Sequence, residues 1–154
     1  MRGKSGSIGP PVTLPFVSEI SVPAESRYVG IARNFVVEVA HQSGWVTETQ
    51  LDDLRLVASE MVTNAIRAQQ LSQTTAHIFV RCSVTDSEVE LQVADAAGGL
   101  DTRELENLAV IDPTQEGGFG LHLISRLSDE AHFERVGSGT SVRTVMFRNG
   151  ISER

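Results

Sequence analysis

Apolar residues recur along this chain with two different periods, and the change of period divides it into strands and helices. Residues 16–22 alternate loosely between apolar and polar side chains and stop at Pro23, which predicts an edge strand. Residues 24–42 carry apolar side chains at three- and four-residue spacing, and Gly44 follows as a stop signal. The pattern therefore predicts a strand and then a helix.

A longer helix is predicted next. Thr47 and Gln50 have the spacing of a capping box, in which each side chain bonds the other residue's backbone amide. No Gly or Pro interrupts the segment from there to about Gln70. Its apolar stripe consists of Leu51, Leu54, Ala58, Met61, Val62 and Ala65. We expect one long amphipathic helix with a single buried face.

The second half of the chain returns to period-2 alternation. The expected elements are strands over 76–82 and 89–93 around the turn Asp86-Ser87, a short helix near 103–108, a helix over 121–127, and a hairpin of strands over 131–136 and 140–147. Strands and helices do not alternate regularly. The fold class is therefore α+β, a two-layer sandwich of a mixed, mostly antiparallel sheet with helices on one face.

Length and composition fit a single domain. The chain has 154 residues, enough to close one hydrophobic core. We expect a flexible N-terminal tail over 1–15, where Gly and Pro are frequent, the domain over 16–148, and a C-terminal tail over 149–154. No run approaches the roughly 18 apolar residues of a membrane span, so no membrane association and a cytoplasmic location are expected. Cys82, the single cysteine, is expected to be a buried thiol.

Charge narrows the class of partner. The formal net charge is -7 at pH 7. A domain this acidic does not hold a phosphate backbone through a general basic surface, so direct nucleic-acid binding is disfavoured and a protein partner is favoured.

Glu60 and Asn64 are the first candidate site residues. They are four residues apart on the long predicted helix, so they lie on one face beside the stripe that Met61 belongs to. An amide oxygen is a hard ligand for Mg²⁺, and a carboxylate can accept the proton of an attacking hydroxyl. The alternative is a solvated helix face without function.

Two glycine-rich turns follow. Asp95 ends a predicted strand where a carboxylate can accept a hydrogen bond from the amine of a base, although an Asp there could also simply form the turn. The run Gly117-Gly118-Phe119-Gly120 precedes a helix, whose free amides and dipole suit an anion such as a di- or triphosphate. A plain hinge is the alternative for this run.

Four motifs occur along the chain in the order that a known superfamily has. Glu-Met-Val-Thr-Asn-Ala-Ile at 60–66, Val-Ala-Asp-Ala-Ala-Gly-Gly-Leu at 93–100, Glu-Gly-Gly-Phe-Gly-Leu-His-Leu-Ile at 116–124 and Gly-Thr-Ser-Val at 139–142 resemble the N, G1, G2 and G3 boxes of the GHKL (Bergerat-fold) ATPases. Within that superfamily, the run from Glu116 is most similar to the anti-sigma-factor serine protein kinases of the RsbW and SpoIIAB type.

The resemblance implies ATP and Mg²⁺ as cofactors and a role for each matching residue. Glu60 is implied to be the general base and Asn64 the Mg²⁺ ligand; Asp95, Gly99 and Thr140 are implied to hold the adenine, Gly117, Gly118, Phe119, Gly120 and Leu121 to form the phosphate-binding lid, and Arg33 to face the partner protein. One departure is Ala97, which stands where the G1 box usually has its middle glycine.

The leading hypothesis is thus an ATP-dependent serine/threonine protein kinase that phosphorylates an anti-sigma-factor antagonist of the STAS type and sequesters a sigma factor. A homodimer is implied by the same resemblance. Ala97 motivates the alternative, a partner-binding module of the same fold with little or no kinase activity. A histidine-kinase fragment is disfavoured because no helix pair with a phosphoacceptor His precedes the domain, and because the segment between Gly99 and Gly117 is short.

Overall fold

The computed structural model describes residues 14–73, 75–95, 118–136 and 139–149. Its elements in chain order are β1 (Phe16–Val22), the 3₁₀ turn η1 (Ser26–Tyr28), α1 (Val29–His41), α2 (Glu48–Leu71), β2 (Ile78–Val84), β3 (Glu88–Asp95), α4 (Gly118–Leu127), β4 (Glu130–Val136) and β5 (Gly139–Phe147).

The described strands form one five-stranded sheet in the order β1-β2-β3-β5-β4. Every neighbouring pair among them is antiparallel, so the sheet is antiparallel throughout this part of the chain rather than mixed. The α+β class is confirmed, as is the edge position of β1. Because β5 pairs with β3 and lies between β3 and β4, β4 is the other edge strand of the sheet.

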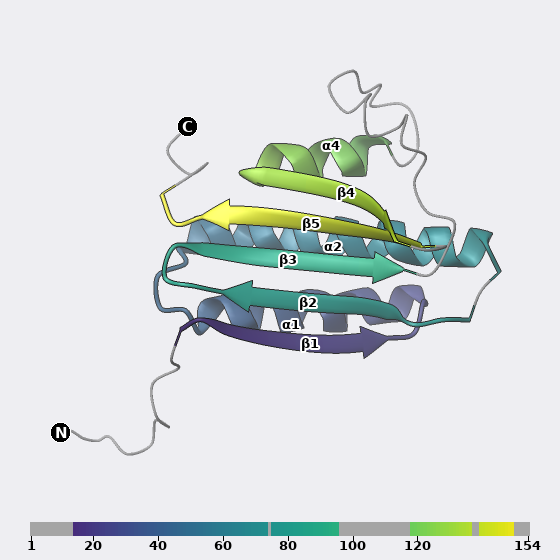
Figure 1. Cartoon of the computed structure of the whole chain (residues 1–154), viewed down its shortest axis with the longest axis horizontal. Helices are drawn as coiled ribbons and strands as arrows, with labels where there is room; N and C mark the ends of the chain where they lie inside the picture. The colour runs from purple at the N-terminus through teal and green to yellow at the C-terminus, as the bar shows by residue number, and fades with distance from the viewer. Residues whose placement is uncertain (1–13, 74, 96–117, 137–138, 150–154) are drawn as a thin grey trace, which may run out of the picture.

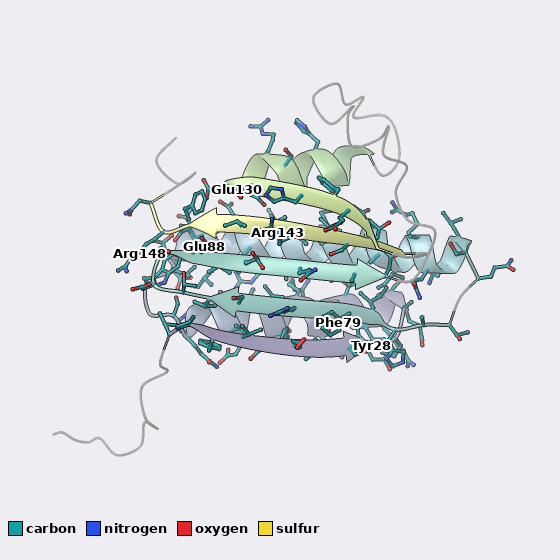
Figure 2. All side chains as sticks on the ribbon, viewed as in Figure 1. Tyr28, Phe79, Glu88, Glu130, Arg143 and Arg148 are labelled. Atoms are coloured by element: carbon teal, nitrogen blue, oxygen red, sulfur yellow. The ribbon has the colours of Figure 1, made fainter. Side chains whose placement is uncertain are left out.

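The helices cover one face of the sheet, as predicted (Figure 1). Alternate strand residues point to the helices and are buried, among them Ile78, Val80, Cys82, Val89, Leu91 and Val93. The intervening residues form the opposite face of the sheet, where Phe79 and Arg143 lie (Figure 2). A two-layer sandwich in which one face of the sheet is exposed to solvent accounts for this alternation.

The long helix begins where the capping box predicts. The Gln50 amide donates to Thr47 Oγ1 at 3.1 Å, and the Thr47 amide donates to Gln50 Oε1 at 3.0 Å. The buried stripe of α2 contains every predicted apolar residue and packs against α1, α4 and the sheet. Local chemistry and tertiary burial therefore agree on this element.

Some boundaries differ from the sequence prediction. The helix expected over 24–42 starts at Val29, because Glu25 has extended backbone angles (φ -133°, ψ 140°) and the Tyr28 amide bonds the Glu25 carbonyl in a 3₁₀ turn. The strand expected from Ala76 starts at Ile78, since the Ala76 carbonyl accepts a hydrogen bond from the Gln69 side chain. The helix expected near 103–108 lies outside the described residues, and the limits of the domain and its tails stay predictions.

The two ends of the sandwich bring different segments together. The end of β3, the start of β5, the start of α4, the start of α1 and the end of α2 lie together, and we call this the site end (Figure 1). The opposite end holds the β2–β3 turn, the end of β5 and the start of α2, tied by Trp45, Gln50, Thr85, Asp129 and Phe147. We call it the tethered end.

Cys82 is buried in the core, as predicted, and has no exposed surface. Loss of solvation on burial raises the pKa of its thiol from 9.0 to about 12. Within the described residues, no helix is long and apolar enough to cross a membrane.

Candidate functional site

Asp95 and Thr140 are direct neighbours across two strands. Asp95 is the last residue of β3 and Thr140 the second of β5, and the antiparallel register pairs them. Thr140 is buried and Asp95 half-buried. Two residues 45 positions apart in sequence, from separate motifs, therefore form one polar pair at the site end.

Glu60 and Asn64 lie one turn apart on α2, as their spacing predicts. Both are half-buried. Met61, between them in sequence, is fully buried and its sulfur accepts a hydrogen bond from Thr144 of β5. That contact fixes the rotation of α2 against the sheet, so it also fixes the direction in which the neighbouring polar pair projects.

The Asn64 side chain is unusual among the buried polar groups. Its Nδ2 atom is buried and has no hydrogen-bond partner among the residues that the structure describes. Leaving a buried amide unpaired costs about 1–3 kcal/mol, so such groups are rare and need an explanation. A half rotation of the carboxamide exchanges nitrogen for oxygen with no change of shape, which puts a hard oxygen ligand at the same place.

The glycine run meets the start of α4. Gly118 is the first residue of this helix, with Phe119, Gly120 and Leu121 in its first turn. The first four amides of an α-helix have no partner within the helix and point out of its N-terminus. The helix α4 packs against α2. It begins at the end of the molecule where β3 ends and β5 starts, so its first amides lie at the same end as Asp95 and Thr140 (Figure 1).

The remaining predicted site residues have different outcomes. Gly99, Gly117 and Ala97 lie outside the described residues. Arg33 is half-buried on α1, where its Nε lies 3.5 Å from Asn34 Oδ1 and its guanidinium folds back beside Gly30. In the described part of the chain, no cluster of His, Cys, Asp or Glu could bind a metal, so a Mg²⁺ site there would rest on Asn64 together with the ligands of the nucleotide itself.

A family model decides the identity of this fold. The model of the histidine kinase-like ATPase domain matches residues 22–146. The chain belongs to this family. Family membership implies that the domain uses a nucleotide, and the match spans all the motifs from Glu60 to Thr140.

Curated relatives narrow the position within the family. The serine-protein kinase RsbW of Bacillus licheniformis is 31% identical over 139 residues and 85% of each chain is covered. RsbW of Bacillus subtilis is 31% identical with 86% of each chain covered, and RsbW of Bacillus pumilus is 33% identical with 85% covered. The chain is thus a histidine kinase-like ATPase domain of the RsbW serine-protein kinase type.

Solved structures support the fold. The SiaB–SiaC complex from Pseudomonas aeruginosa contains a chain that superposes with a TM-score of 0.63 at 18% identity, covering 84% of this chain and 88% of that one. The RsbU and RsbW domains of a Mycobacterium tuberculosis protein superpose with a TM-score of 0.62 at 19% identity, covering 84% of this chain and 32% of that one. The α+β sandwich of the family is therefore confirmed by geometry.

One feature of the site end is not predicted by any motif in the sequence. A surface cleft of about 220 Å³ lies between the start of α1 and the last turns of α2. Its walls come from two segments some 40 residues apart. Thr63 and Ile66 belong to the motif at 60–66, but that motif does not predict a cleft. Only the antiparallel packing of the two helices creates it.

Proposed function

We propose that this chain is an ATP-dependent serine kinase that phosphorylates an anti-sigma-factor antagonist and sequesters a sigma factor when the antagonist is phosphorylated. Membership of the RsbW serine-protein kinase type supports this function. The structural observation that carries this proposal is the buried side-chain amide of Asn64, which has no partner among the described residues. Asn64 lies one turn from Glu60 on α2, and the core contact between Met61 and Thr144 sets the rotation of that helix.

The chemistry available at this pair fits phosphoryl transfer. Magnesium held by the Asn64 oxygen would neutralise negative charge on the phosphates of ATP. Glu60, on the same face of α2, would take the proton of the substrate serine. The serine oxygen then forms a bond to the γ-phosphorus, the bond from that phosphorus to the β–γ bridging oxygen breaks, and ADP leaves with that oxygen.

The rest of the site end would bind the nucleotide. The carboxylate of Asp95 is proposed to accept a hydrogen bond from the adenine amine, with Thr140 beside it across the strand pair. Free backbone amides at Gly118 and Gly120 are proposed to bind phosphate oxygens at the start of α4. The proposal also includes Gly99 for the adenine and Gly117 for the phosphates, both outside the described residues.

The partners follow from the same proposal. We propose a STAS-type antagonist as substrate, a sigma factor as the sequestered protein, Arg33 on the partner-facing surface, a homodimer as the working unit and the cytoplasm as its location. The formal charge of -7 argues against direct contact with DNA or RNA through a general basic surface.

Phosphate transfer to purified STAS-type antagonists from the same genome, followed with radiolabelled ATP, tests the proposal. We expect serine phosphorylation of at least one of them. Glu60→Gln should lower the transfer rate about 10²- to 10⁴-fold, the usual contribution of a general base, with ATP affinity retained. Glu19→Gln is a matched control, because Glu19 is an exposed carboxylate on β1 at the opposite face of the sheet.

Calorimetric titration with Mg-ATP separates this function from a partner-binding module without catalysis. Binding followed by transfer supports the kinase. No measurable ATP binding, or equal transfer by the native chain and the Glu60→Gln variant, would contradict it.

A further inference from the structure

The cleft between α1 and α2 lies on the helical layer, to which Glu60 also belongs. It is lined by Ser26, Val29, Thr63, Ile66, Arg67 and Gln70. Small-molecule pockets usually enclose roughly 300–1,000 Å³, so a cleft of about 220 Å³ is small for a nucleotide or a metabolite. A single side chain of another protein fits this scale better.

The lining has a definite charge. Arg67 is the one charged residue among the six, and no carboxylate belongs to them. Arg67 is half-buried and makes no ion pair or hydrogen bond with any residue that the structure describes. Arg27 nearby is already engaged, since its Nε donates to Glu25 at 3.1 Å and its guanidinium lies over the Tyr28 ring. The unpaired guanidinium of Arg67 thus faces a cavity in a chain whose net charge is negative.

The walls suit a carboxylate on a short aliphatic stem. An Arg guanidinium can hold a carboxylate through two parallel hydrogen bonds, a geometry that Lys cannot reproduce. Val29 and Ile66 provide apolar surface, while Ser26 and Thr63 provide hydroxyl donors. Gln70 is held in place because its Nε2 donates to the Ala24 carbonyl at 3.3 Å. Together these groups match an Asp or Glu side chain.

The position along α2 relates the cleft to the chemistry. Thr63 precedes Asn64, and Arg67 follows Glu60 by seven residues, which is about 10 Å along a helix axis at 1.5 Å per residue. An extended peptide rises about 3.3 Å per residue, so roughly three residues span that distance. A carboxylate seated on Arg67 would therefore place a hydroxyl about three residues away beside Glu60.

We propose that this cleft binds one acidic side chain of the protein substrate and selects antagonists that carry a carboxylate about 10 Å from the phosphorylated serine. The inference rests on the proposed kinase function. It adds a recognition site, separate from the nucleotide-binding residues, for an acidic protein surface. Arg67 is the residue that determines specificity, with Thr63 and Ser26 as its neighbours.

Steady-state phosphorylation of the antagonist that accepts phosphate from the native chain tests the inference. Arg67→Ala should raise the KM for the antagonist about 10-fold or more, with kcat and the KM for ATP unchanged. Arg67→Lys should recover only part of the loss, because the ammonium lacks the two-pronged geometry. Arg81→Ala is the matched control, since Arg81 is an exposed arginine of β2 on the opposite face of the sheet.

A charge exchange makes the test specific. Arg67→Glu should raise the KM further. Changing the antagonist's acidic residue that lies about 10 Å from its serine to Lys should restore much of the loss. An Arg67→Ala variant with native KM for the antagonist overturns the inference even if the kinase is active. Absence of phosphate transfer from the native chain to every antagonist contradicts the proposed function, and the recognition site falls with it.

Discussion

The two ends of this domain differ in the pairing of several of their polar groups. At the tethered end the Trp45 indole donates to the Thr85 carbonyl at 2.9 Å, and Gln50 Nε2 donates to the Phe147 carbonyl at 3.1 Å. The Phe147 backbone amide donates to Asp129 Oδ2 at 2.7 Å. At the site end, Asn64 Nδ2 is buried without a partner in the described part of the chain, and Arg67 lines a cleft to which no carboxylate belongs.

Buried polar groups stabilise a fold only when they are paired. The paired groups of the tethered end therefore contribute to stability, whereas the unpaired groups of the site end do not. Satisfied bonds at the tethered end join the loop before α2, the β2–β3 turn and the end of β5 across long sequence separations. Arg148 adds to them by lying over the Trp45 ring at 5.6 Å from its centroid, at the end where Figure 2 labels it. Unsatisfied groups at the site end instead cost stability and are available to ligands.

Among the variants that test this difference between the two ends, Asn64→Leu at the site end has the largest expected effect. The variant removes an amide whose nitrogen is unpaired, so the free energy of unfolding should be unchanged or higher. Phosphate transfer should fall about 10²- to 10³-fold, the range seen when one preorganised polar group of a catalytic site is lost. Urea unfolding and transfer assays on the same preparation measure both. A loss of stability with activity retained would show that Asn64 is a structural residue.

The paired counterpart is Gln50→Leu at the tethered end. Gln50 is also buried, but its side chain bonds the Phe147 carbonyl and the Thr47 amide. Its loss leaves those two backbone groups unpaired, so unfolding should become easier by about 1–3 kcal/mol. Transfer by the folded molecules should stay at the native rate. Equal stability of the Gln50→Leu variant and the native chain would remove the distinction between the two ends.

A smaller effect concerns the pH dependence of the free energy of unfolding, which involves Cys82 in the hydrophobic core. Because the pKa of the Cys82 thiol is raised to about 12, the native state keeps its proton at pH values where the unfolded thiol loses it. The native state thus binds more protons above about pH 9, and stability falls as pH rises toward 12. The stability difference between the native chain and Cys82→Ala should shift by about 1.4 kcal/mol between about pH 8 and pH 10.

Denaturant unfolding of both chains across that range measures this shift, and the direction is decisive. The native chain should lose its advantage, or fall further behind the variant, as pH rises. A constant difference would mean that the thiol titrates alike in both states and that solvent reaches Cys82.

Much of the fold could be predicted because it is written in local patterns. The capping box at Thr47 and Gln50 and the stripe through Met61 together encode α2, and the alternation of apolar residues encodes β2 and β3. All three elements are present, with ends of the two strands that differ from the prediction by one or two residues. The predicted start of α1 was wrong by five residues. The 3₁₀ turn at Ser26–Tyr28 depends on one backbone hydrogen bond to Glu25 and on packing. The spacing of apolar residues in the sequence predicts neither of them.

By itself, the sequence determined which residues are candidates for the site, because four motifs in a fixed order include Glu60, Asn64, Asp95 and Thr140. Only the tertiary structure decided that Asp95 and Thr140 are cross-strand neighbours, that the Asn64 amide is buried without a partner, and that Arg67 lines a cleft. The physical reason is distance along the chain. Helical and strand periods are local, whereas register, burial and cavities come from segments that meet only when the core closes.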